Sequence, residues 1–82
     1  MKINVHIRDE MIVINCGPGT QKIEWLGDTA CHRYDPNYLW DVGTVSDIKL
    51  QGGVLLNMKG IICEDLTDDV HVYVQLLEDS LA

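Results

Sequence analysis

The sequence is poor in positive charge. Its 82 residues include six Lys and Arg against 13 Asp and Glu, which gives a net charge of −7 at pH 7. Binding to nucleic acid or to an anionic membrane depends on clustered basic side chains, and the six here are scattered along the chain. We therefore expect neither nucleic acid nor a membrane among its partners.

Cysteine is scarce and irregularly placed. Cys16, Cys31 and Cys63 are odd in number, and no two of them lie close together in the sequence. A disulfide framework uses an even number of cysteines, so the pattern predicts reduced thiols in a cytoplasmic setting, each a small buried side chain. A catalytic thiol is not expected, because Cys31 and His32 are neighbours on a predicted helix and point about 100° apart.

Long apolar runs are missing as well. No stretch approaches the roughly 18 apolar residues that span a bilayer, and the chain opens into an alternating pattern rather than a signal peptide. With 46% apolar and 23% charged residues, the composition is that of a folded globular chain. We expect one domain over residues 1–77, followed by a short acidic tail or the start of a linker at residues 78–82.

Strict alternation indicates a β-hairpin in the first part of the chain. Residues 2–7 (KINVHI) place Ile3, Val5 and Ile7 on one face, and residues 11–16 (MIVINC) resume the alternation after a short polar turn. A Gly-Pro-Gly segment then ends the second strand, because proline lacks an N–H and glycine adopts unusual backbone angles.

A single helix is predicted over residues 20–34. Apolar residues three or four apart form one stripe along it: Ile23, Leu26, Ala30 and Tyr34. Thr20 is the expected N-cap, and the residue before Pro36 disfavours helical angles and ends the helix. Gly27 weakens the helix by about 1 kcal/mol relative to alanine, so tertiary packing must hold it. Trp25 lies off the stripe and is a candidate for contact with another domain.

Short strands are predicted in the second half of the chain. Residues 46–50 (SDIKL) and 54–58 (VLLNM) flank a Gln-Gly-Gly turn, and residues 70–76 alternate as a last strand. Residues 38–45 show no firm period and are predicted to be a loop over one end of the core, with Trp40 buried. The long connection before the last strand can reach the core through three residues: Ile61, Ile62 and Leu66. The expected fold is α+β, a five-stranded mixed sheet on one helix, with the last strand parallel to the first in its centre.

Four segments carry a resemblance to a known family. They are MKINVHI at residues 1–7, GPGTQKIEWL at 17–26, LQGGVLL at 50–56 and LTDDVHVYVQL at 66–76. In order and spacing they resemble the ubiquitin-like domains, which have the β-grasp fold. The resemblance covers nearly the whole chain, but it is a pattern of core positions and speaks to the fold more than to the function.

The family divides into modifiers and sulfur carriers, which end in a Gly-Gly tail, and docking modules built into larger proteins. The only glycine pair of this sequence, Gly52-Gly53, lies inside a predicted turn. The resemblance therefore implies a non-conjugatable protein-interaction module, the N-terminal domain of a larger intracellular protein. No enzymatic activity and no cofactor are expected.

Ubiquitin binds its receptors through the outer face of the sheet. The matching positions here are His6, Met11, Val13, Lys49, His71 and Tyr73. His71 agrees with a histidine of ubiquitin, whereas Lys49 and Tyr73 stand where the family has a central isoleucine and a valine. Receptors that insert small apolar side chains are therefore expected to bind poorly. A register shift of one residue would exchange Lys49 for Ile48.

Two further hypotheses concern an acidic cluster and a pair of histidines. An acidic cluster before the last strand resembles the motif of Phox-and-Bem domains and suggests weak self-association as an alternative function: Glu64, Asp65, Asp68 and Asp69. His6 and His71 are expected side by side on the two central strands. Two imidazoles do not make a structural zinc site, which generally uses four protein ligands, so no metal is expected.

Overall fold

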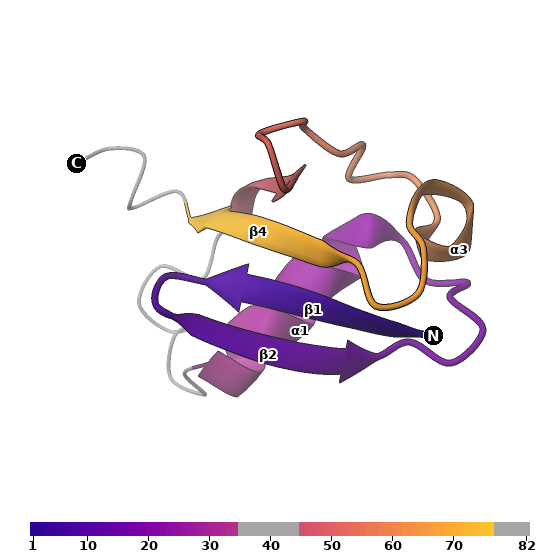
Figure 1. Cartoon of the computed structure of the whole chain (residues 1–82), viewed down its shortest axis with the longest axis horizontal. Helices are drawn as coiled ribbons and strands as arrows, with labels where there is room; N and C mark the ends of the chain where they lie inside the picture. Colours follow the sequence, from indigo (N-terminus) through magenta and orange to yellow (C-terminus); the bar gives the residue numbers. More distant parts are fainter. Residues whose placement is uncertain (35–44, 77–82) are drawn as a thin grey trace.

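The computed structural model describes residues 1–34 and 45–76. In this part of the chain the fold is α+β, with a four-stranded mixed sheet and one main helix across one of its faces (Figure 1). The elements are β1 (Lys2–Ile7), β2 (Glu10–Asn15), α1 (Ile23–Tyr34), β3 (Val45–Leu50), α3 (Ile62–Asp65) and β4 (His71–Leu76). Figure 1 looks onto the sheet, with α1 behind it.

The strands lie in the order β2-β1-β4-β3. β1 pairs with β2 and β4 pairs with β3 in antiparallel fashion, while β1 and β4 are parallel neighbours in the centre, with Val5 opposite Val72. The predicted hairpin and the predicted parallel pairing of the first and last strands are both confirmed. The two central strands therefore come from opposite ends of the described chain.

The core lies between the sheet and α1. The alternation along the strands and the stripe along the helix both bury the residues that the sequence predicted, among them Ile3, Val5, Ile7, Ile14, Ile23, Leu26, Ala30 and Val72. Ile62 and Leu66 also reach it, as expected, whereas Ile61 is half-buried and is not part of it. Gly27 also has a role in packing. A Cβ at this position would lie 3.0 Å from Val45 Cγ2, so the lack of a side chain on Gly27 lets β3 approach the helix closely.

The helix begins three residues later than predicted, and Thr20 is not its N-cap. The backbone N–H of Ile23 donates to the Gly60 carbonyl at 2.9 Å, and that of Glu24 donates to the Met58 carbonyl at 3.1 Å. The first N–H groups of α1 thus donate to carbonyls of a turn that is distant in sequence, and not to the hydroxyl of Thr20. Residues 21 and 22 meanwhile pair with the segment that enters α3, which holds them out of the helix.

The predicted fifth strand is wrong. Residues 54–58 form a single β-bridge, between Leu55 and Lys49, flanked by two backbone hydrogen bonds. The chain then turns away, because the carbonyls of Met58 and Gly60 accept the N–H groups of α1 and are not available to extend a ladder. The connection that follows also contains a short helix, α3, which the sequence analysis did not predict. Residues 35–44, with Trp40, and the predicted tail at 78–82 lie outside the described residues.

Candidate functional site: the outer face of the sheet

Two rows of side chains cross the face of the sheet opposite α1, which we call the outer face. Residues directly opposed in neighbouring strands share one side of a sheet. The first row is Met11, His6, Tyr73 and Lys49, and the second is Val13, Asn4 and His71. All six residues predicted for a docking face therefore lie together. The predicted register of β3 is confirmed, because Lys49 pairs with Tyr73 whereas Ile48 is buried.

Leu55 extends the first row by one residue. It is bridged directly opposite Lys49, and its side chain is 59% exposed. Neither the sequence pattern nor the resemblance gave Leu55 a role at the site. The signal that could have found it is the Gly52-Gly53 turn, which folds residues 54–56 back beside β3.

Exposed apolar side chains gather on this face. Met11 is 50% exposed, Val13 45% and Tyr73 37%, and together with Leu55 they make up four of the five large apolar side chains that are exposed in the described part of the chain. The fifth is Val54, which follows the Gly-Gly turn and lies outside the two rows. Single exposed apolar residues are ordinary, whereas a group on one face needs an explanation.

An aromatic cluster occupies the middle of the face. Nε2 of His6 and Nδ1 of His71 lie 2.8 Å apart, and the rings are tilted by 35° with their centroids 5.1 Å apart. The Tyr73 ring stacks on the ring of His6 at a centroid distance of 4.5 Å. The short nitrogen–nitrogen distance requires one imidazole to donate its N–H to the lone pair of the other, so at least one ring of the pair is neutral.

The histidine contact predicts a pH effect. Partial burial of the ring and the neighbouring His71 lower the pKa of His6 from its ordinary value of 6.5. Between the lowered pKa and 6.5 the unfolded chain binds more protons at this site than the native chain, so the free energy of unfolding falls as the pH drops through that range. An NMR titration should give a His6 pKa below 6.5, which His71→Gln raises part of the way back. A wild-type value at or above 6.5, or no change in the variant, would contradict this.

The acidic cluster is only partly available for contact with another molecule. Asp68 Oδ1 accepts the backbone N–H of Lys2 at 2.7 Å, and this hydrogen bond lowers the pKa of Asp68. Asp69 Oδ1 accepts a hydrogen bond from the side-chain amide of Asn4 at 3.0 Å, and the backbone N–H of Asp69 donates to the Lys2 carbonyl. These two residues therefore attach the loop to β1. Glu64 and Asp65 are exposed on α3.

The cysteines divide into two kinds. Cys16 and Cys31 are buried as predicted, but Cys63 is exposed, because α3 directs its neighbour Ile62 into the core instead. Burial and the neighbouring Asp28 carboxylate raise the pKa of Cys31 to about 11. Its sulfur is a protonated thiol at neutral pH, which disfavours nucleophilic chemistry there.

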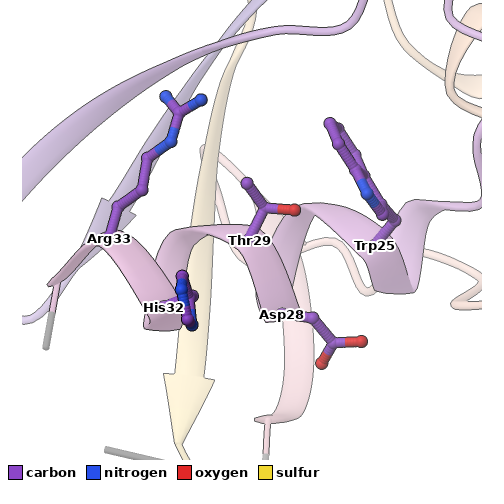
Figure 2. A pocket seen from close by; sticks show the side chains of 5 residues that line it. All are labelled: Trp25, Asp28, Thr29, His32 and Arg33. Atoms are coloured by element: carbon purple, nitrogen blue, oxygen red, sulfur yellow. The ribbon is translucent and has the colours of Figure 1, made fainter. Parts of the chain in front are cut away.

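A shallow hollow of about 540 Å³ lies along α1 and is lined by Trp25, Asp28, Thr29, His32 and Arg33. Figure 2 shows Trp25, Thr29 and Arg33 pointing to the same side of the helix, with Asp28 directed away from them. Arg33 Nη1 donates to the Val13 carbonyl on the edge strand β2 at 3.1 Å. Trp25 is half-buried and packs against the core, so its contact with another domain stays a prediction. Most of the surface that lines the hollow is apolar, although four of its five side chains carry a polar or charged group.

No protein-family model matches the chain, and no curated protein matches it either. Within residues 1–34 and 45–76, no three His, Cys, Asp or Glu side chains are grouped so that they could hold a metal ion. None of the helices in the same ranges has the length and apolar character needed to cross a bilayer.

Proposed function

We propose that this protein is a ubiquitin-like protein-interaction module that binds another protein through the outer face of its sheet. The central parallel pair, the antiparallel strand on each side and the helix across one face support the β-grasp assignment. The bridge at Leu55 lies where the remaining short strand of such a fold is expected.

The observation that carries this proposal is the gathering of exposed apolar side chains on the outer face. Met11 and Tyr73 flank His6 in the first row, Val13 lies in the second row, and Leu55 ends the first row beyond Lys49. Covering such side chains with a partner releases water from apolar surface, which contributes roughly 25 cal/mol per Å² removed from solvent. Aromatic residues at the centre of a contact contribute most of the binding energy in many interfaces. Tyr73 and His6 are therefore the anchors that we assign to the contact.

The chemistry of the face also indicates the kind of partner. Its two rows contain one formal charge, on Lys49, although the whole chain carries a net charge of −7. Lys2 and Asp47 lie on the same face at its margins, in the pairs Lys2–Asn15 and Asp47–Gln75. A partner surface with apolar side chains at its centre and a carboxylate opposite Lys49 would match this pattern. Because Tyr73 is bulky, the partner must offer a recess rather than a protruding apolar side chain at that position.

This function is tested by comparing partner capture from a cell lysate by the wild type and by two glutamate variants. The double variant His6→Glu/Tyr73→Glu places charge in the centre of the face and should lower recovery of specific partners about tenfold or more. Val54→Glu is the matched control, because Val54 is 61% exposed but lies outside the rows. It should recover the partners as the wild type does. Equal recovery by both variants, with unchanged circular dichroism, would remove the outer face as the docking surface.

The self-associating alternative needs a different variant. Charge reversal at Asp68 and Asp69 would break hydrogen bonds to β1 and confound folding with association. Glu64→Lys/Asp65→Lys changes the charge of α3 without removing those bonds. Concentration-dependent association that this variant abolishes would favour the acidic cluster over the outer face as the functional surface.

A further inference from the structure

We propose that His6 and His71 form a two-histidine chelate for a divalent transition metal of the Ni²⁺, Cu²⁺ and Zn²⁺ class. The site lies on the outer face but does not depend on the protein-docking function proposed above. It differs from a structural zinc centre, because two protein nitrogens leave the other coordination positions to water.

The geometry of the two rings carries this inference. Metal–nitrogen bonds to imidazole are about 2.0–2.1 Å long, so two nitrogens bound at adjacent positions of one ion lie about 2.9–3.4 Å apart. Nε2 of His6 and Nδ1 of His71 are 2.8 Å apart. A separation a few tenths of an ångström larger would meet the distance that a shared ion requires. Both rings must also turn about their side-chain bonds, so that the two lone pairs converge on the ion instead of pointing at each other.

The protons on the two imidazole rings can be arranged so that both facing nitrogens bind a metal ion. In the metal-free pair one of the two facing nitrogens carries a hydrogen and donates it to the other. In the chelate both facing nitrogens offer lone pairs, and each neutral ring keeps its single proton on its other nitrogen, Nδ1 of His6 and Nε2 of His71. A neutral pair therefore binds the ion by a change of tautomer, without oxidation and without net loss of a proton. Imidazole nitrogen favours Ni²⁺, Cu²⁺ and Zn²⁺ over Mg²⁺ or Ca²⁺.

The two imidazole rings lie next to each other only in the folded protein. The two histidines stand 65 residues apart in sequence and meet because β1 and β4 are parallel neighbours. The Tyr73 ring stacked on His6 restricts one of the two imidazoles further. Since the unfolded chain does not hold the two rings together, a bound ion must stabilise the folded protein.

Thermal unfolding of the protein with and without NiCl₂ tests the site. At a Ni²⁺ concentration about 100 times Kd, the Tm of the wild type should rise by roughly 11–22 °C, and EDTA should reverse the rise. His6→Ala and His71→Ala should each abolish the shift. His32→Ala, which removes an exposed histidine on α1, should retain it. No shift in the wild type, or an undiminished shift in either of the first two variants, would overturn the proposal.

A measurement on the wild type alone guards against variants that fold poorly. Substoichiometric Ni²⁺ is paramagnetic in most imidazole complexes with water ligands, so NMR signals near the ion should broaden. The imidazole C–H signals of His6 and His71 should broaden before those of His32. Broadening that begins at His32 or at Cys63 would assign the ion elsewhere and refute the chelate.

Discussion

Replacing Gly19 with alanine is expected to lower the free energy of unfolding by about 3 kcal/mol. Gly19 has a φ of +75°, and a Cβ at this position would lie 2.8 Å from Met1 Sδ and 2.9 Å from Cys63 Cβ. A left-handed backbone costs alanine roughly 1–2 kcal/mol, and overpacking adds a further cost of about 1–3 kcal/mol. The Cys63 N–H donates to the Gly19 carbonyl at 2.8 Å, so α3 cannot withdraw without losing that hydrogen bond.

Gly17 provides the matched control for this prediction. Its φ is +56°, and a Cβ there would meet no atom within 4 Å. Gly17→Ala therefore carries the backbone cost alone, about 1 kcal/mol. Urea denaturation of the two variants measures the difference directly. Equal losses at the two positions would show that the contact between α3 and the Gly19 loop tolerates a methyl group.

Asn4→Asp is expected to lower the free energy of unfolding by about 3 kcal/mol at pH 7. Asn4 is only 6% exposed, and its Nδ2 donates to the Asp69 carbonyl at 2.9 Å and to Asp69 Oδ1 at 3.0 Å. The substitution keeps the shape but replaces the donor with a carboxylate that faces another carboxylate. A buried group that loses its partner costs roughly 1–3 kcal/mol, and more when it is charged.

The pH dependence of this loss separates charge from packing. Like charge and burial raise the pKa of the introduced carboxyl in the native state, so the variant should regain stability relative to the wild type as the pH falls toward about 4. Asn15→Asp is the control, because Asn15 is exposed and its Oδ1 accepts the Gly17 N–H, a role that a carboxylate keeps. Its expected effect is within about 0.5 kcal/mol. A constant difference between Asn4→Asp and wild type at both pH values would exclude the electrostatic explanation.

Asn4 also connects the fold to the candidate site. Its amide holds the loop at residues 68–70 against β1, immediately before β4 begins at His71. Loss of this hydrogen bonding should disturb the position of His71 relative to His6. The destabilised variant is therefore also expected to bind Ni²⁺ more weakly, which the NMR titration described above would measure.

Local periodicity was enough to predict much of this protein. The alternation of Ile3, Val5 and Ile7 and the stripe through Ile23 and Leu26 predicted the buried faces correctly. These patterns are readable because every second strand residue, or every third or fourth helix residue, must leave water together. The resemblance to ubiquitin-like domains supplied the residues proposed for docking. The same alternation predicted that they lie on the outer face, since the side of a strand that is not buried is known once the buried side is known.

Tertiary structure decided the rest. The start of α1, the loss of a fifth strand and the attachment of Asp68 and Asp69 to β1 all follow from backbone groups that bond to partners far along the chain. No local signal identifies such partners, because a buried N–H or carbonyl can be satisfied from any segment that folding brings near it. The sequence led us to expect His6 and His71 side by side, but the pairing of β1 with β4 determined the 2.8 Å distance between their facing nitrogens.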